Sequence, residues 1–572
     1  MQNLRIAAVV LTLITSITAC GNESPSPANP SSTGGSAATP ANGGSGNTAG
    51  NLATGGSVAP ANGGTSGGAS SNTGGQTNTG GTKADGGAGA GGGAGAGGAM
   101  GGVAGSSTGG SAPGGNASGG SDATPAGGSS AGGPGNTTAE LVTSGPNDYW
   151  NTEGAVAPAS GAAELTIDAS MQFQTLTGFG GCFNEMGWDA LSVLPAEEVT
   201  RAMKLLFDAN DGANFVYGRL PMGASDYSMS WYTLDDTAGD YEMNSFSIAR
   251  DKEKLIPFIR AALAVNPDIK LWASPWVVPS WMMTGSNLKN DAQTLGAHAL
   301  YMARFVEEYQ KEGLELVAIH PQNEPGYARV RWTQAQFVDF IKTYLGPTFA
   351  ERGITAEIWA GTMSKDPEDT NIAKAVAADP EAMKYTKGFG VQWNLQAAVA
   401  TLGKSAPVMQ TEHKCGNYNF ETPYWDRSRY DAAKPQNDHL YGEETWQLLR
   451  DWIVSGVNSY SAWNMVLDSI GKSLDNWPQN ALLVVDRSAK KLVVTPAYYA
   501  FRHYSQYVLP GAKRVAVTGS TDAIAFVNAD GSVVTQVYNK GDAAKPTSVG
   551  VGGASYAFEV PSHGWATLRV SP

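Results

Sequence analysis

The sequence predicts an α/β protein, a (β/α)8 TIM barrel with an attached β-sandwich domain built mainly from the C-terminus. Two observations predict this fold. Between residues 176 and 464, short apolar runs alternate with helical patterns eight times, which is typical of a closed parallel barrel. After Tyr504, short apolar runs continue between turn residues without any helical period, as in a small antiparallel β domain.

The first 20 residues predict a lipoprotein-type signal peptide. The apolar run from Ile6 to Ile17 is shorter than the roughly 20 residues that span a bilayer. The tetrad Ile17-Thr-Ala-Cys20 resembles a bacterial lipoprotein signal, in which Cys20 becomes the lipidated residue. We therefore expect an exported protein, either anchored as a lipoprotein at the periplasmic face or cell surface, or secreted. The alternative is an ordinary signal peptide with an incidental cysteine.

Residues 21–138 predict a disordered tether. They consist mainly of Gly, Ser, Ala, Thr, Asn and Pro, and such a stretch cannot bury enough apolar surface to offset its ordering entropy. Strings of glycine match a G-x-G-x-x-G pattern by composition alone. No strand precedes them and no helix follows, so they do not indicate a nucleotide site.

The composition of the chain limits the classes of molecule that the part after residue 138 can bind. The net charge of −14 argues against nucleic acid and is compatible with neutral substrates such as sugars. The 15 Trp and 21 Tyr offer flat faces for sugar rings, although most aromatic side chains lie in cores. The 6 histidines lack ligand spacing, so we expect no metal and no cofactor, and no protein partner is evident. Cys182 and Cys415 can either pair in an oxidising compartment or remain separate thiols.

The expected elements follow in order along the chain. The eight barrel strands begin at Leu176, Phe215, Ile269, Val317, Ala356, Gly388, Pro407 and Val457. Helical spacing predicts helices over 196–209, 249–265, 292–311 and 333–344, and another that carries Trp446, Leu449 and Ile453. Thr333 is placed to cap the fourth of these.

The domain boundaries follow from these patterns. Residues 139–175 lead into the barrel and form part of the β domain, residues 176–497 form the catalytic barrel, and residues 498–572 form the β-sandwich. The expected β strands cover 515–517, 523–527, 533–538 and 565–570, and the run 163–167 can join them. Two long connections, 226–246 and 417–441, should lie around the mouth of the active site.

Two carboxylates stand where buried strands end. The run Val317 to Pro325 places Glu324 at the end of an apolar strand, and the run Pro407 to Thr411 ends in the same way at Glu412. Cleavage of a glycosidic bond commonly uses a pair of carboxyl groups, and we expect Glu324 to act as an acid. Arg219, at the end of another strand, could orient a carboxylate or form only a structural ion pair.

An ordered set of motifs resembles glycoside hydrolase family 30, the glucosylceramidase-like bacterial β-glycosidases. The resemblance extends from about Leu165 to Val570. It rests on Gly178-Phe-Gly-Gly181, Arg219-Leu-Pro-Met-Gly-Ala-Ser-Asp-Tyr-Ser228, Ser274-Pro-Trp276, Gln322-Asn-Glu-Pro325, Thr411-Glu412, Trp463-Asn464 and the segment from Tyr498 to Ala512.

The resemblance implies a retaining double displacement on a barrel with an attached β-sandwich. It makes Glu324 the acid/base, with a raised pKa, and Glu412 an ionised nucleophile helped by Arg219. Retention requires the two carboxyl groups to lie about 5 to 5.5 Å apart. The expected substrate-binding residues are Asn323, at the 2-hydroxyl of the sugar, Trp463, under the site, and Arg219, Glu185, Asp226, Trp276 and Trp393.

One departure leaves the sugar open. Glucosylceramidase-like members carry Thr-Asp-Ala after the first strand, and that aspartate holds distal sugar hydroxyls. This chain has Asn184-Glu-Met186 there. A longer carboxylate at Glu185 would change the fit, so a glucoside, fucoside, galactoside, xyloside or β-1,6-glucan remains possible.

Two other functions compete with an exo-acting β-glycosidase. One is an endo-acting β-glycanase, on xylan or β-1,6-glucan, built on the same scaffold. The other is a non-catalytic glycan-binding surface lipoprotein, against which the presence of both Glu324 and Glu412 argues. An esterase lacks support, because no G-x-S-x-G turn accompanies a suitable His and Asp.

Overall fold

The computed structural model describes residues 138–414, 439–476 and 479–572. The signal peptide, Cys20, the tether and most of the 417–441 connection lie outside the described residues. So does Cys415, and with it the question of its pairing with Cys182. Within the described ranges, no helix is both long enough and apolar enough to cross a bilayer.

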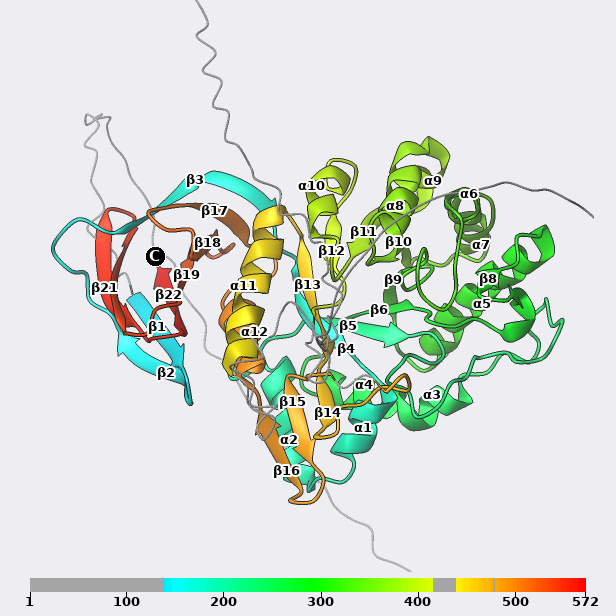
Figure 1. Cartoon of the computed structure of the whole chain (residues 1–572), viewed down its shortest axis with the longest axis horizontal. Helices are drawn as coiled ribbons and strands as arrows, with labels where there is room; N and C mark the ends of the chain where they lie inside the picture. Colours follow the sequence, from blue (N-terminus) through cyan, green and yellow to red (C-terminus); the bar gives the residue numbers. More distant parts are fainter. Residues whose placement is uncertain (1–137, 415–438, 477–478) are drawn as a thin grey trace, which may run out of the picture. The chain divides into compact units, whose positions relative to one another are not determined.

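A closed eight-stranded barrel forms the centre of the chain (Figure 1). Neighbouring strands pair in parallel in the order β4-β5-β6-β9-β10-β11-β12-β13, and β13 returns to β4. Each expected strand is present, so the barrel prediction is confirmed. The strands are β4 (Gly178–Cys182), β5 (Tyr217–Pro221), β6 (Lys270–Ser274), β9 (Leu316–Ile319), β10 (Glu357–Met363), β11 (Thr386–Val391), β12 (Val408–Gln410) and β13 (Ser459–Asn464).

Strand β4 needs glycine because its neighbours come very close. A Cβ atom on Gly180 would lie 2.1 Å from the carbonyl oxygen of Tyr217, and one on Gly181 would lie 2.3 Å from Cγ of Met465. No larger residue fits at either position without moving the atoms beside it. The glycines therefore allow the strand to pack closely against its neighbours.

Helices surround the barrel and bury their apolar faces against it. On α5 (Ala292–Lys311), the expected face of Leu295, Ala299, Met302, Val306 and Tyr309 is buried. The other α-helices around the barrel are α1 (Glu185–Leu191), α2 (Ala196–Phe207), α3 (Ala249–Lys254), α4 (Ile256–Leu263), α6 (Gln334–Asp339), α7 (Gly346–Glu351), α8 (Glu368–Ala378), α9 (Pro380–Tyr385), α10 (Val399–Leu402), α11 (His439–Ser455) and α12 (Pro496–Ser505). Short 3-10 turns cover Ser280–Met282 and Gln396–Ala398.

Two expected helices differ in detail from the prediction. The helix expected over 249–265 is divided into α3 and α4, because Pro257 in the first turn of α4 has no N–H to continue the ladder. The helix expected over 333–344 begins as α6, capped by Thr333, which accepts from the backbone N–H of Gln336 at 3.2 Å. It continues as a π-helix over Phe340–Leu345.

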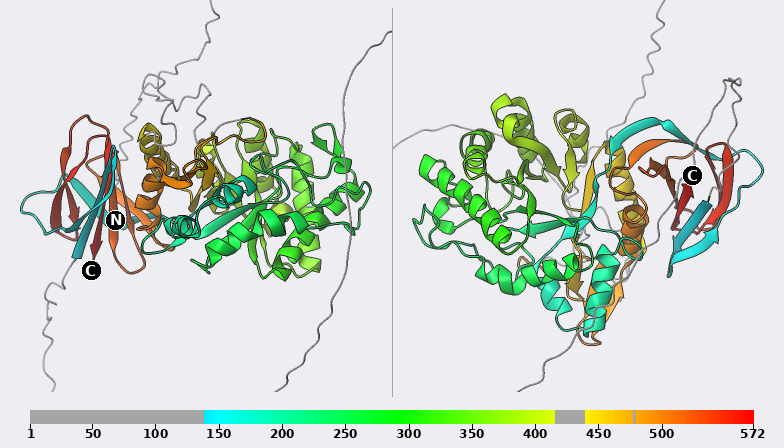
Figure 2. Two further views of the ribbon diagram at one scale, coloured as in Figure 1. Left: turned by 90° about the horizontal axis from the view of Figure 1, so that it is seen from below. Right: turned by 180° about the vertical axis from the view of Figure 1, so that it is seen from behind.

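The C-terminal strands form a nine-stranded sheet in the order β2-β1-β22-β19-β18-β17-β3-β20-β21. Residues 165–167 of the run 163–167 lie in β3, which pairs with β17 and β20, so the run joins the β domain as expected (Figure 2). Apolar residues from the strands before the barrel, such as Leu141 and Leu165, and from those after it, such as Val549, share one buried cluster. The strands are β1 (Thr138–Gly145), β2 (Asp148–Ala155), β3 (Leu165–Thr175), β17 (Lys513–Thr518), β18 (Ala523–Val527), β19 (Val533–Asn539), β20 (Lys545–Val551), β21 (Ala554–Val560) and β22 (Gly564–Ser571).

Smaller sheets accompany the barrel. Strands β14 (Val466–Asp468), β15 (Leu483–Asp486) and β16 (Lys491–Val494) form one, and β7 (Met283–Thr284) and β8 (Asn287–Leu288) form a short hairpin. The expected boundary between residues 497 and 498 falls inside α12, which packs against α11.

Candidate active site

A cavity of about 1140 Å³ lies where the carboxyl ends of the barrel strands meet. Its walls come from the loops that follow different strands, which is the position where barrel enzymes carry their chemistry. Six of the predicted site residues line it: Asp226, Trp276, Asn323, Glu324, Trp393 and Glu412.

Both carboxylate oxygens of Glu412 accept hydrogen bonds. Arg219 Nη1 donates to Oε2 at 2.6 Å, and the indole Nε1 of Trp393 donates to Oε1 at 2.7 Å. Glu412 is 5 % exposed, so the carboxylate is held in one orientation with little access to water. This arrangement stabilises the charged form of Glu412 and fixes its direction.

Arg219 links Glu412 to Asn323. Its side chain is completely buried on β5, and Nη2 donates to Oδ1 of Asn323 at 2.7 Å. Thr362 Oγ1 also donates to that oxygen, at 2.7 Å. Since both donors use Oδ1, the amide nitrogen of Asn323 is left to donate to a ligand.

Stacked indoles lie against the guanidinium. Cζ of Arg219 is 4.2 Å from the ring centroid of Trp276, and Trp276 stacks on Trp463 with their centroids 5.2 Å apart. Trp276 lines the cavity, whereas Trp463 supports it from behind and is 2 % exposed. The pair therefore gives the site a rigid aromatic wall and a delocalised cation beside it.

Neutral groups hold Glu324 in place. The residue is half-buried with φ = 52°, a left-handed conformation that is costly for a residue other than glycine. Gln392 Nε2 donates to Oε1 of Glu324 at 3.2 Å, and the backbone N–H of Glu324 donates to the carbonyl of Thr362 at 2.9 Å. Both of these contacts to Glu324 come from uncharged groups, and its carboxyl group lines the cavity.

The surroundings of the two glutamates separate their proton affinities. Burial, the Glu412 charge and the Asp369 charge together raise the pKa of Glu324 to about 8. Burial also raises the pKa of Glu412, but the Arg219 charge and the hydrogen bond from Trp393 oppose that rise. The guanidinium of Arg219 bonds Glu412, whereas Glu324 receives a bond from the neutral Gln392, so the ionised form is favoured at Glu412, and this is the division of roles that an acid and a nucleophile need.

Asp226 offers a second polar contact to a ligand. It lines the cavity, and its Oδ1 is buried without a hydrogen-bond partner among the described residues. Burial, followed by the charge of Glu412, raises the pKa of Asp226 to about 7. An unsatisfied oxygen in this position is suited to meet a hydroxyl group.

Glu185 does not lie where the sequence places it. Its carboxylate does not line the cavity. Arg250 holds it in two bonds, from Nε to Oε1 at 2.8 Å and from Nη2 to Oε2 at 2.7 Å. The structure therefore pairs Glu185 with an arginine that sequence spacing did not reveal, which differs from the direct sugar contact expected from the sequence.

Sequence reasoning missed Gln392, which precedes the predicted Trp393. Its Nε2 reaches Glu324, as described above, and its Oε1 accepts from Thr411 Oγ1 at 2.8 Å. It therefore connects the loops that carry the two glutamates. Its place at the exit of β11, beside Trp393, was the signal that could have identified it.

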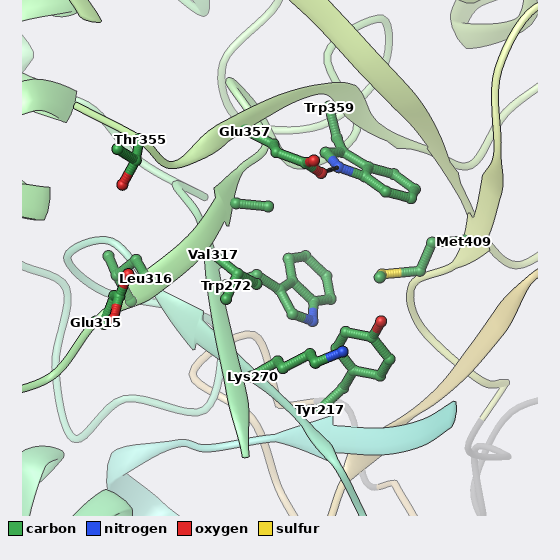
Figure 3. A pocket seen from close by; sticks show the side chains of 11 residues that line it. Tyr217, Lys270, Trp272, Glu315, Leu316, Val317, Thr355, Glu357, Trp359 and Met409 are labelled. Carbon is green, nitrogen blue, oxygen red and sulfur yellow. Dashed lines mark hydrogen bonds between the residues drawn. The ribbon is translucent and has the colours of Figure 1, made fainter. Parts of the chain in front are cut away.

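A second cavity, of about 400 Å³, lies at the opposite ends of the strands (Figure 3). Tyr217, Trp272 and Trp359 surround it, together with Lys270 and Glu357. Trp359 Nε1 donates to Oε2 of Glu357 at 2.9 Å. Residues at the amino ends of barrel strands generally serve stability, and none of the predicted site residues is here, so we place the chemistry in the larger cavity. Among the described residues, no cluster of His, Cys, Asp and Glu is suited to hold a metal ion.

Known proteins resemble this chain over both domains. The glycosyl hydrolase family 30 TIM-barrel domain matches residues 176–508, and the β-sandwich domain of the same family matches residues 511–568. Lysosomal acid glucosylceramidase of Mus musculus is 27 % identical over 427 residues, covering 67 % of this chain and 79 % of the mouse protein. An endo-1,6-β-D-glucanase of Neurospora crassa is 25 % identical over 413 residues, covering 66 % and 82 %. The crystal structure of SrfJ from Salmonella typhimurium superposes with a TM-score of 0.67 at 24 % identity, covering 76 % of this chain and 99 % of that one.

Proposed function

The chain belongs to glycosyl hydrolase family 30, and on this premise we propose that Glu412 and Glu324 are the nucleophile and the acid/base of its reaction. The enzyme is a retaining β-glycosidase that hydrolyses O-glycosidic bonds. In the first step the Glu412 carboxylate attacks the anomeric carbon while Glu324 protonates the departing oxygen. In the second step the deprotonated Glu324 takes a proton from a water molecule as that water attacks the anomeric carbon, and the bond from the sugar to the Glu412 carboxylate breaks.

The observation that supports these roles is the unequal placement of Arg219. The guanidinium bonds Glu412 at 2.6 Å, whereas Glu324 receives a hydrogen bond from the neutral Gln392. A nucleophile must be ionised, and an acid must hold its proton at the working pH. The opposite assignment would place the acid beside the guanidinium, which favours the ionised form.

The sugar would be held by groups around this pair. Asn323 is oriented to donate from its amide nitrogen, Asp226 presents an acceptor, and Trp276 and Trp393 supply aromatic surface. We propose that these four residues contact the substrate and that Trp463 acts by supporting Trp276.

The test is hydrolysis of a panel of 4-nitrophenyl β-glycosides (glucoside, galactoside, fucoside and xyloside) by the wild type and by Glu412→Gln. Wild-type turnover of one glycoside, lost in the variant while the fold is retained, would support the assignment. Equal rates for the two proteins would remove Glu412 as the nucleophile.

An endo-acting β-glycanase is the second candidate. The cavity of about 1140 Å³ exceeds the roughly 300 to 1,000 Å³ of ordinary small-ligand pockets, so it has room for more than one sugar ring. Soluble β-1,6-glucan and xylan added to the panel distinguish the two functions. Activity on a polymer with silence on every nitrophenyl glycoside would identify an endo-enzyme, and silence on all substrates would favour a glycan-binding protein.

We also propose that the protein is exported and anchored through a lipid on Cys20. The lipoprotein-like tetrad that ends at Cys20 supports this, as does the Gly- and Ser-rich composition of the residues that follow. Detergent-phase partitioning of the full chain and of Cys20→Ala tests it. Wild-type protein in the detergent phase and variant protein in the aqueous phase is the expected result, and equal partitioning would exclude the anchor.

A further inference from the structure

We propose that Glu185 and Arg250 form a positioning pair that sets sugar preference by holding the loop of residues 226–232, the Asp226 loop, against the active site. The inference rests on the proposed function, since it assumes that Asp226 meets the sugar. It assigns Glu185 an indirect role and gives a function to Arg250, which no sequence pattern indicates.

The hydrogen bonds that Glu185 already accepts leave its carboxylate little capacity for a ligand. The side chain is completely buried. Besides the two bonds from Arg250, the backbone N–H of Met229 donates to Oε2 at 2.7 Å. A buried carboxylate that already accepts three hydrogen bonds is a structural anchor.

The same arginine, Arg250, also binds the Asp226 loop. Nη1 of Arg250 donates to Oγ of Ser230 at 2.8 Å, and Nη2 donates to the carbonyl of Ser230 at 3.3 Å. Cζ lies 4.0 Å from the ring centroid of Tyr232. Met229, Ser230 and Tyr232 are therefore fastened together by one guanidinium and one carboxylate.

The backbone that carries Arg250 is held in place by its neighbour Asp251. Asp251 is completely buried in α3 and accepts from the hydroxyl groups of Tyr232 at 2.8 Å and Tyr309 at 2.9 Å. Helix α5, which carries Tyr309, thereby holds the start of α3 in place. A long arginine side chain on such a base can position a loop.

The Asp226 loop carries these contacts to the cavity. Asp226 lies three residues before Met229 on the same loop, and its Oδ1 is the unpartnered acceptor described above. Its carbonyl accepts from the backbone N–H of Leu474 at 2.7 Å, so the Asp226 loop is fixed at both ends. Loss of the Glu185–Arg250 pair would remove the bonds that hold Met229 and Ser230 and allow Asp226 to move relative to the sugar, and small displacements of positioning groups have large effects on binding.

The experiment measures kcat and KM for the glycoside panel with Glu185→Gln, Arg250→Met and the double variant of the full chain. We expect each single variant to raise KM about tenfold for the preferred sugar, the scale of one lost charged hydrogen bond, and to reduce the preference between sugars. We expect the double variant to resemble the single ones, because both residues act through one contact.

Arg352→Met is the matched control. Arg352 forms the same two-bond arrangement with Glu307, from Nε to Oε1 at 2.7 Å and from Nη2 to Oε2 at 2.9 Å, at a site that does not line the cavity. We expect it to leave KM and sugar preference unchanged. If Arg250→Met does not fold, Arg250→Lys replaces it, since lysine keeps the charge but not the paired bonds, and a smaller change in the same direction is expected.

A second background identifies the residue that contacts the sugar. With Asp226→Asn already present, Glu185→Gln should cause no further change in sugar preference. Additive effects of these two changes, or a preference altered by Glu185→Gln and not by either Arg250 variant, would show that Glu185 touches the sugar and would overturn the inference. If wild type hydrolyses the panel and Glu412→Gln does not, while the Glu185 and Arg250 variants behave like Arg352→Met, the positioning role fails and the proposed function stands.

Discussion

Replacing Arg219 with Met should move the acid limb of the pH–rate profile to higher pH. Arg219 Nη1 lies 2.6 Å from Oε2 of Glu412, in a site where both side chains are shielded from water. An opposite charge at such a distance lowers the pKa of a carboxyl group by about 1 to 3 pH units. Loss of the guanidinium should therefore raise the pKa of Glu412 by a similar amount. Because Glu412 must be ionised to attack, the acid limb should move to higher pH by the same number of pH units. At a fixed pH below the new limb, kcat/KM should fall by about tenfold for each pH unit by which the limb moves.

The assay is kcat/KM for the best nitrophenyl glycoside between pH 4 and 9, for wild type, Arg219→Met and Arg219→Lys. The lysine variant keeps a charge and should move the limb less. Because breaking a buried ion pair costs about 3 to 5 kcal/mol of stability, each variant is first checked for cooperative unfolding. A folded Arg219→Met protein whose acid limb coincides with that of the wild type would refute the claim that Arg219 keeps the nucleophile ionised.

Three further predictions follow from the same contacts. Glu324→Gln should lose most activity on glycosides with unactivated leaving groups but retain formation of the glycosyl-enzyme from a dinitrophenyl glycoside, because a good leaving group needs no acid; equal losses on both substrates would argue against the acid role. Burial raises the pKa of Asp251 from 3.8 to about 7, so the native state binds a proton more tightly than the unfolded chain and its free energy of unfolding declines as pH rises through that window. Asp251→Asn should therefore weaken this decline between pH 4 and 7, as measured by urea unfolding at several pH values, and an unchanged slope would contradict the assignment. Glu357→Gln, in the cavity of Figure 3, should lower the melting temperature slightly and leave kcat/KM unchanged, whereas a selective loss of activity would place function at the amino ends of the strands.

The fold could be predicted because its signals are local. A barrel strand that is buried on both sides is a short apolar run, and the run before Glu324 and the one before Glu412 each end in a polar residue at the rim. The expected strands did not include β20 and β21, although the hairpin that they form also has a local signal. Gly552 and Gly553, both at positive φ, form the two-residue turn that joins Val551 to Ala554.

The missed features depend on contacts between residues far apart in the sequence. Glu185 and Arg250 are separated by 65 positions, and no periodicity connects them. The same holds for the bond from Gln392 to Glu324, 68 positions apart. A sequence motif can place a carboxylate at the end of a strand. The partner that pairs with this carboxylate depends on how the loops fold, and the sequence does not show that. At Glu185, the partner decides whether the side chain anchors a loop or binds a ligand.

Backbone strain at the site indicates how the geometry of the glutamates is maintained. Glu324 and Trp393 both adopt left-handed backbone conformations, with φ of 52° and 51°. Such conformations cost about 1 to 3 kcal/mol each and persist only where surrounding contacts hold them. Here the holding contacts are visible, since Thr362 accepts from the backbone N–H of Glu324 and Glu412 accepts from the indole of Trp393. The left-handed backbone thus directs the Glu324 carboxyl group into the site and the Trp393 indole onto Glu412. Glycine would relax the backbone at either position, but it would also remove the side chain that acts there.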